Sequence, residues 1–201
     1  LYQHSVAEVR VQLVISLGVL QMDVDIKVLK PRQPVPELEV DTLQGPWSLS
    51  EQTPDNFTML VFYRGLHCPL CTKYLKELDR LSGDFSEIGV TVLVLSSDDK
   101  ERALEAQLNW DLQNISLAYG VTTEQAQSWG LHRSAGKGKT STGIEEPAEF
   151  SEPGLFLIRS DRTLYWSQVS TMPFARPLFR EVLGALNFVL ANNYPARGEL
   201  V

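Results

Sequence analysis

The sequence predicts an α/β protein, because strongly apolar strands and amphipathic helices alternate along most of its length. Two runs, 57–63 (FTMLVFY) and 89–97 (GVTVLVLSS), are almost continuously apolar and β-branched, as is typical of strands buried on both faces. The stretch 69–81 places apolar side chains on one stripe at helical spacing and charged side chains on the opposite face. A chain of 201 residues is long enough to bury the core that such a domain needs.

Residues 1–30 carry no recognisable chemistry, and we expect an N-terminal extension there, followed by one domain over 31–201. Alternation of polar and apolar residues over 23–29 (DVDIKVL) predicts a strand within the extension. The run 11–22 is as long as the apolar core of a signal peptide, but no basic region precedes it and no small-residue cleavage site follows. Three prolines within 30–36 predict an extended lead-in to the domain.

The other predicted elements follow in order along the domain. Thr122 or Thr123 can cap one helix, Gly83 can end the helix that begins at residue 69, and the Gly/Ser/Lys-rich stretch 132–152 should be a surface loop. Short strands are expected at 37–40 and 47–50, helices at 98–108 and 122–131, a hairpin at 153–170 that turns at 160–162, and a closing helix at 176–193.

The composition excludes several classes of protein. A net charge of −7 argues against nucleic-acid binding, which requires a basic face. No stretch reaches the roughly 18 uncharged apolar residues of a membrane span. Two cysteines are too few for a secreted scaffold held together by disulfides. We therefore expect a soluble, cytoplasmic protein with no nucleic-acid or membrane partner.

The only two cysteines, Cys68 and Cys71, lie three positions apart where the buried strand gives way to the first helix. A zinc site would need two further ligands at compact spacing, but only His67 is adjacent, and His4 and His132 are isolated. We therefore expect no metal and no other cofactor. The pair can still be two buried hydrophobic residues without chemistry, or a redox centre.

Four features favour the redox interpretation. Cys68 is expected at a helix N-terminus, where unpaired backbone N–H groups and the helix dipole stabilise a thiolate. Pro69 suits the first helical position, and Cys71 follows one turn later, close enough to close a disulfide. Pro153 comes directly before a late strand in EPGLFLI. This chemistry requires that the sulfur of Cys68 is not sealed in apolar packing.

The unit of strand, C-P-x-C and helix, with a proline before a later strand and a hairpin and helix at the end, resembles the thioredoxin fold. The implied architecture is a central mixed β-sheet flanked by helices. More specifically, FYRGLHCPLC, VLVLSSDD, AYG, GLFLI and NYPARGEL are similar to redoxins of the peroxiredoxin type (alkyl hydroperoxide reductase/thiol-specific antioxidant). The likeness runs from about Gln33 to the C-terminus. It implies a thiol-dependent antioxidant enzyme in which Cys68 attacks and Cys71 resolves.

Two positions depart from the peroxiredoxin pattern. Where a typical peroxiredoxin has a threonine or serine three residues before its reactive cysteine, this chain has Gly65. Where peroxiredoxins have an arginine before the strand similar to GLFLI, it has Pro153, and thioredoxins carry a cis-proline beside the active sulfur at that place. Both departures point toward thiol–disulfide exchange.

Neighbouring residues have a chemical and a structural interpretation each. His67 can stabilise the Cys68 thiolate as a cation or accept a proton, or it can be a solvent-facing loop residue. Arg64 can supply positive charge to an oxidised sulfur, or form a surface salt bridge. Arg176 is expected to start the last helix or to pair with an acid, and Tyr63 to belong to the core.

The substrate and the partners stay open at this point. A peroxide would take Cys68 through a sulfenic acid, and a disulfide substrate would take it through a mixed disulfide. A thioredoxin-like protein or glutathione is the expected reductant, and the resemblance also implies a homodimer. The alternatives are a non-enzymatic redox sensor and a zinc-binding or purely structural module.

Overall fold

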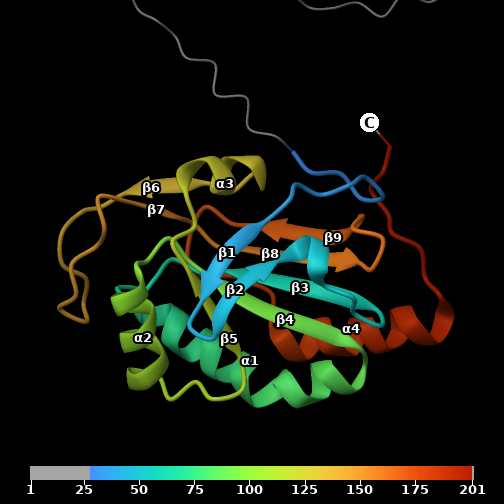
Figure 1. Ribbon diagram of the computed structural model, residues 1–201, viewed down its shortest axis with the longest axis horizontal. Helices are drawn as coiled ribbons and strands as arrows, with labels where there is room; N and C mark the ends of the chain where they lie inside the picture. The colour runs from blue at the N-terminus through green and yellow to red at the C-terminus, as the bar shows by residue number, and fades with distance from the viewer. Residues whose placement is uncertain (1–27, 201) are drawn as a thin grey trace, which may run out of the picture.

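The computed structural model of the chain describes residues 28–200 (Figure 1). The apolar run at 11–22 therefore lies outside the described residues. So does most of the strand predicted at 23–29, and its last two residues, Val28 and Leu29, are not in a strand. No helix among residues 28–200 is long and apolar enough to cross a membrane.

A mixed seven-stranded sheet forms the centre of the molecule, in the order β2-β1-β5-β4-β3-β8-β9 (Figure 1). Strands β3, β4 and β5 run parallel, whereas β8 pairs antiparallel with β3 and β1 pairs antiparallel with β5. The predicted α/β class and mixed sheet are thus confirmed. The strands are β1 (Glu39–Thr42), β2 (Gly45–Ser48), β3 (Phe57–Phe62), β4 (Val90–Leu95), β5 (Ser116–Tyr119), β8 (Gly154–Arg159) and β9 (Leu164–Val169).

Among residues 28–200 there are four α-helices, and both faces of the sheet are covered by helices. Helices α1 and α4 lie side by side against one face, and α3 lies on the other (Figure 1). A separate pair of short strands, β6 and β7, lies on the same side as α3. The bounds are α1 (Pro69–Glu87), α2 (Lys100–Asn109), α3 (Thr123–Ser128), α4 (Phe179–Asn192), β6 (Arg133–Ala135) and β7 (Glu149–Ser151), with a 3-10 turn at Leu49–Glu51.

The central strand β3 shows why its sequence is apolar without interruption. Side chains of successive strand residues point to opposite faces of a sheet. Met59 and Val61 belong to the core under α1 and α4, whereas Leu60 and Phe62 belong to the core under α3. Because both faces are covered, every residue of β3 is buried, and the carboxyl end of the strand leads directly into the segment that carries the cysteines.

Three predicted helix boundaries are wrong, one of them the end of α3, which lies at Ser128 instead of residue 131. Helix α1 continues past Gly83 to Glu87, because Phe85 beyond the glycine is fully buried, which outweighs the cost of about 1 kcal/mol for a helical glycine. Helix α4 begins at Phe179 instead of residue 176. Pro177 disfavours helical backbone at the residue before it, so Arg176 lies outside the helix.

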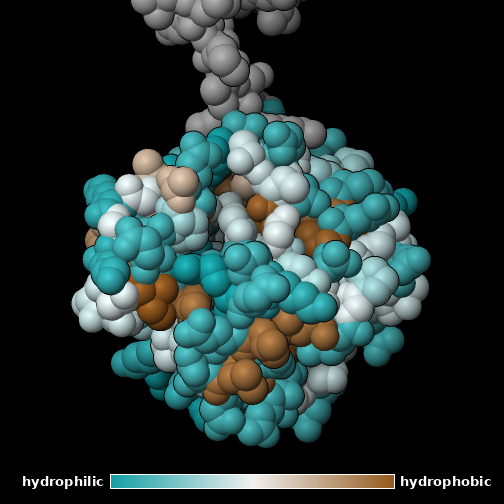
Figure 2. Space-filling view, turned by 60° about the vertical axis from the view of Figure 1, so that its left-hand side comes forward, coloured by the Kyte–Doolittle hydropathy of each residue, from teal (hydrophilic) through white to brown (hydrophobic). Residues whose placement is uncertain are grey.

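The stretch 132–152 is not only a surface loop. Its ends pair as β6 and β7, and Phe150 of β7 is buried. The pairing brings Phe150 against the loop that precedes the cysteines, as described below. The side of the molecule that Figure 2 shows is mainly hydrophilic, with separate apolar patches.

Candidate active site

Cys68 and Cys71 stand at the start of α1, immediately after the loop that follows β3. Cys68 is the N-cap residue with extended backbone, and Pro69 is the first residue of the helix. The Cys71 thiol donates a hydrogen bond to Cys68 Sγ across 2.7 Å, and its backbone N–H donates to the Cys68 carbonyl oxygen at 3.1 Å. The strand-to-helix junction therefore brings the two sulfurs together.

Both cysteines are fully buried, with 0% of their surface exposed. Their surroundings are not purely apolar, however, because the Arg176 guanidinium reaches the pair and the sulfurs contact each other. A substrate cannot reach either sulfur without a local movement of the protein. The site is thus closed, and both sulfurs belong to the apolar core under α1 and α4. The expectation that the sulfur of Cys68 is not sealed in apolar packing is therefore wrong for this closed conformation.

The two sulfurs differ sharply in acidity. The hydrogen bond from the Cys71 thiol lowers the pKa of Cys68 to about 7, helped by the Cys71 backbone N–H and the charges of Arg176 and Arg64, although burial opposes the change. Burial raises the pKa of Cys71 well above its ordinary value, and the neighbouring Cys68 raises it further. Cys68 is therefore the sulfur that ionises first, near neutral pH, while Cys71 stays protonated as its hydrogen-bond donor.

Arg176 is the functional candidate that the sequence did not reveal. Its Nη1 lies 3.7 Å from Cys71 Sγ, its Nη2 donates to the Leu70 carbonyl oxygen at 3.1 Å, and its guanidinium stacks 3.9 Å above the Tyr74 ring. The expectation that it starts the last helix or pairs with an acid is wrong. The one local signal was Pro177 after it, which places it ahead of the helix.

Arg64 is held by carboxylates instead of facing the sulfurs. It forms ion pairs with Glu152 at 3.3 Å and Glu146 at 3.6 Å, and its guanidinium lies 4.6 Å above the Phe150 ring. Its side chain is largely buried, so the salt bridge is internal and not on the surface. Its charge still lowers the pKa of Cys68, though it is the smallest of the contributions named above.

His67 is neither solvent-facing nor a cation at neutral pH. It is fully buried against Phe150, with the ring centres 4.6 Å apart, and within residues 28–200 neither ring nitrogen has a hydrogen-bond partner. Burial, and then the charge of Arg64, lowers the pKa of His67 to about 4. Those two predictions are therefore wrong, and His67 is a neutral imidazole beside Cys68.

Gly65 has a structural reason to lack a side chain. Its φ is +135°, and a Cβ atom there would lie 2.7 Å from Oδ1 of Asp98. The buried Asp98 carboxylate accepts hydrogen bonds from the Leu66 backbone N–H at 2.7 Å and from Arg102 Nε at 2.9 Å. Burial raises the pKa of Asp98. A carboxylate thus fills the space that a hydroxyl-bearing residue would need.

Pro153 is buried just before β8 and shares a cavity of about 10 Å³ with Tyr74 and Arg176. The described residues contain no cis peptide bond, so Pro153 does not reproduce the cis-proline of thioredoxins. Residues 28–200 also contain no group of three or more histidine, cysteine or acidic side chains that could hold a metal ion.

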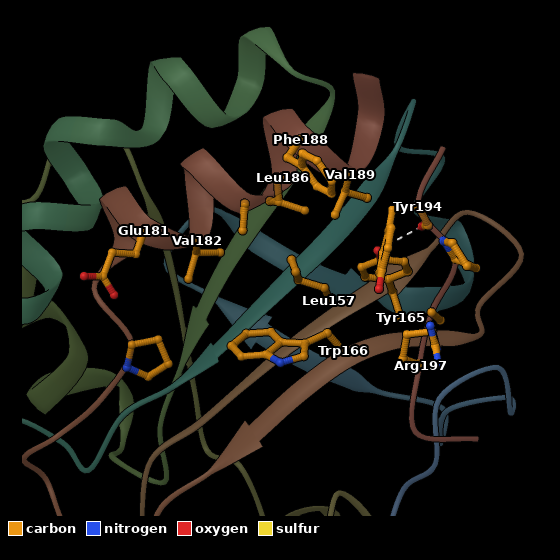
Figure 3. A pocket seen from close by; sticks show the side chains of 14 residues that line it. Leu157, Tyr165, Trp166, Glu181, Val182, Leu186, Phe188, Val189, Tyr194 and Arg197 are labelled. Atoms are coloured by element: carbon orange, nitrogen blue, oxygen red, sulfur yellow. Dashed lines mark hydrogen bonds between the residues drawn. The ribbon is translucent and has the colours of Figure 1, made fainter. Parts of the chain in front are cut away.

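A larger cavity, of about 540 Å³, lies away from the cysteines (Figure 3). It is an apolar groove between α4, the strands β8 and β9, and the C-terminal tail, and Leu157, Trp166 and Val182 are among its walls. Neither cysteine lines it. We place the chemistry at the cysteines, because the groove is lined by no thiol, and it shares only the wall residue Pro177 with the small cavity beside Pro153 and Arg176.

Comparison with known proteins identifies the family of the chain. The AhpC/TSA family matches residues 31–167, about two thirds of the chain. A 1-Cys peroxiredoxin of Medicago truncatula is 36% identical over 76 residues, which are 38% of this chain and 33% of that protein. The 1-Cys peroxiredoxin B of Oryza sativa subsp. indica is 34% identical over 67 residues, 33% of this chain and 30% of that protein. The chain thus spans about a third of the length of these curated relatives.

Solved structures share the fold at low sequence identity. Peroxidoxin BcpB from Mycobacterium tuberculosis superposes with a TM-score of 0.63 at 21% identity, covering 81% of this chain and 99% of that one. A putative thiol:disulfide interchange protein DsbE from Chlorobium tepidum gives a TM-score of 0.59 at 16% identity, covering 81% and 98%. These similarities establish the thioredoxin-like fold of the redoxins. Together with the match over residues 31–167, they show that the chain belongs to the AhpC/TSA family.

Proposed function

We propose that this chain is a thiol-dependent antioxidant oxidoreductase of the peroxiredoxin type, with Cys68 as the attacking thiolate and Cys71 as the resolving thiol. One observation carries the proposal. The Cys71 thiol donates to Cys68 Sγ across 2.7 Å, at the N-terminus of a helix, and this bond is the largest of the effects that lower the pKa of Cys68 to about 7. A thiolate is thus available at neutral pH, next to a thiol that can resolve it.

The reaction with a peroxide follows from these two sulfurs. The Cys68 thiolate attacks the peroxide, an S–O bond forms, the O–O bond breaks, and the leaving oxygen takes up a proton and departs as alcohol or water. Cys71 then attacks the sulfenic sulfur, so that a disulfide forms and water leaves. An external thiol, from a thioredoxin-like protein or glutathione, returns two electrons and two protons to the pair.

Direct thiol–disulfide exchange is the second candidate, and two positions favour it. Gly65 offers no hydroxyl to a peroxide, because Asp98 occupies the space, and Pro153 replaces an arginine. In this version the Cys68 thiolate attacks a substrate disulfide, which forms a mixed disulfide and releases one substrate thiolate. Cys71 then attacks the Cys68 sulfur, the Cys68–Cys71 disulfide forms, and the second substrate thiol leaves. Redox sensing without turnover would use the same two cysteines.

The deciding experiment compares two assays on the same protein. Hydrogen-peroxide consumption with a thioredoxin system or glutathione is measured beside the reduction of insulin disulfides. We expect peroxide consumption that Cys68→Ser abolishes and that Cys71→Ser stops at a trapped oxidised Cys68. Peroxide turnover no faster than that of a free thiol would contradict the peroxidase, and full activity in either variant would contradict the assigned roles.

The proposal extends to the partners and the setting of the protein. A reducing compartment such as the cytoplasm would supply the external thiol and keep the pair reduced between cycles. We also propose a homodimer, which light scattering would detect by its mass. A monomeric mass would remove that part without affecting the chemistry.

A further inference from the structure

The nine residues 170–178 join β9 to α4 and run across the first turns of α1; we call this segment the strap. Besides the contact of Arg176 Nη1 with Cys71 Sγ at 3.7 Å, three contacts attach it to α1. Arg176 Nη2 donates to the Leu70 carbonyl oxygen at 3.1 Å, the Arg176 guanidinium stacks on Tyr74, and the Tyr74 hydroxyl donates to the Pro177 carbonyl oxygen at 3.0 Å. The strap is therefore attached to α1 directly beside the fully buried cysteines.

The other cover of the cysteines is held much more firmly. Loop 64–67 is fixed by the Leu66 backbone N–H, which donates to the buried Asp98 carboxylate, and by His67, which packs on Phe150. In contrast, the strap exposes large apolar side chains, with Met172 at 47% and Phe174 at 58%. A segment with few buried contacts opens at lower cost than one with many. The strap is thus the side from which the sulfurs can be uncovered.

The charges around the sulfurs single out Arg176. Tyr63 and Tyr74 have raised pKa values and stay neutral, because both are buried, and His67 is neutral as well. Arg64 is compensated by Glu146 and Glu152. Within residues 28–200 Arg176 has no carboxylate within ion-pair distance, and Cys71 Sγ lies 3.7 Å from its Nη1. Its positive charge is therefore available to the sulfur pair.

We propose that the strap is the gate of the redox site, and that Arg176 is a positioning residue that couples the gate to the charge on the sulfurs. This inference rests on the proposed redox role of the pair. The Arg176 guanidinium stabilises the thiolate, and the thiolate in turn stabilises Arg176 in its closed position. The two effects have the same free energy, because coupling between two sites is reciprocal. Oxidation to the Cys68–Cys71 disulfide removes the negative charge, so the strap loses that attraction and opens more readily toward a reductant.

Alkylation by iodoacetamide across a range of pH separates the two parts of the proposal, with mass spectrometry assigning the label to Cys68. The midpoint of the rate profile measures the pKa of Cys68. The plateau at high pH, where Cys68 is fully ionised, measures how often the strap opens. Arg176→Ala should move the midpoint up by about one pH unit and raise the plateau about fivefold, the factor for loss of one ordinary hydrogen bond. Tyr74→Phe, which removes only the bond to Pro177, should raise the plateau and leave the midpoint unchanged.

Arg180→Ala is the matched control, since Arg180 is an exposed arginine on α4 whose one ion pair within residues 28–200 is with Glu77, at 3.6 Å. It should change neither midpoint nor plateau. Unchanged plateaus in both Arg176→Ala and Tyr74→Phe would refute the gate, and an unchanged midpoint in Arg176→Ala would refute the coupling. None of these readouts needs turnover, so a protein that consumes no peroxide would refute the proposed function and leave this test intact.

Amide hydrogen exchange of the strap tests whether oxidation of the cysteines makes the strap open more readily. Wild-type protein is compared after reduction and after disulfide formation with diamide, with thiol counting to verify each state. Strap amides should exchange faster in the oxidised protein, and this difference should shrink in Arg176→Ala but persist in Arg180→Ala. Equal exchange in the two redox states of the wild-type protein would overturn the proposed coupling.

Discussion

Replacing Gly65 with alanine tests why this site lacks a side chain where peroxiredoxins carry a hydroxyl. The substitution forces a Cβ into backbone with φ of +135°, which costs on the order of 1–3 kcal/mol. The same atom would lie 2.7 Å from Asp98 Oδ1, and crowding of this kind costs roughly 1–3 kcal/mol. We therefore expect a loss of about 2–6 kcal/mol from a domain whose total stability is about 5–15 kcal/mol.

Urea unfolding of the reduced protein, followed by tryptophan fluorescence, measures this loss, since Trp110 and Trp129 are buried. Asp98→Ala removes the colliding carboxylate but leaves the Leu66 N–H without its acceptor, which costs about 1–3 kcal/mol. In the double variant Gly65→Ala/Asp98→Ala, the new Cβ at residue 65 no longer meets a carboxylate at residue 98. It should therefore be more stable than the sum of the single losses predicts, by about 1–3 kcal/mol.

Gly83→Ala serves as the control, because this helical glycine has open space where a Cβ would go. It should stabilise the protein by about 0.5–1 kcal/mol. If the losses from Gly65→Ala and Asp98→Ala add within about 0.5 kcal/mol, the two residues do not compete for one space and the reasoning is refuted.

Three further predictions concern the sulfurs and their neighbour. Cys71→Ala should raise the pKa of Cys68 from about 7 toward the roughly 8.5 of a free thiol, because the Cys71 hydrogen bond is the main cause of its lowering; an alkylation midpoint that stays near 7 would contradict this. Because the pKa of Cys68 is lowered, the native state binds fewer protons than the unfolded state between about pH 7 and 8.5. The free energy that Cys68 ionisation contributes to the stability of the reduced protein should therefore rise by about 2 kcal/mol across that window. This contribution should be lost as pH falls through 7. Urea unfolding at both ends of the window should show this rise in the wild type and not in Cys68→Ser, and equal slopes in the two proteins would count against it. His67→Phe should leave the pH profile of Cys68 alkylation unchanged, because the imidazole is neutral and without a hydrogen-bond partner in the described chain; a displaced midpoint would show that His67 acts on the thiolate.

Local pattern was sufficient for the elements that are buried on all sides or capped by their own residues. The uninterrupted apolar run at 57–63 became β3, and the Thr122 side chain caps α3 through a capping box with Gln125. The position of Cys68 at a helix N-terminus also followed from its neighbours, since Pro69 and the amphipathic stretch after it are local signals.

Contacts between distant segments could not be predicted in the same way. Arg176 reaches Cys71 from 105 residues further along, out of a segment with no periodicity. Phe150 sits in a stretch whose polar composition indicates a surface loop, yet pairing of β6 with β7 buries it beside His67. The low pKa of His67 is caused mainly by burial, and burial by a distant segment cannot be deduced from the spacing of residues along the chain.

The short separation of the two sulfurs has a consequence for survival under high oxidant. Once an oxygen is transferred to Cys68, the nearest nucleophile is already in place, and an intramolecular neighbour can act as if present at 10⁵ M or more, on the order of magnitude known for well-oriented groups. A second peroxide from solution has no such advantage of position, although the raised pKa of Cys71 means that its thiol must lose its proton as it attacks. In the proposed reaction, closure of the Cys68–Cys71 disulfide would therefore protect Cys68 from oxidation to the irreversible sulfinic state.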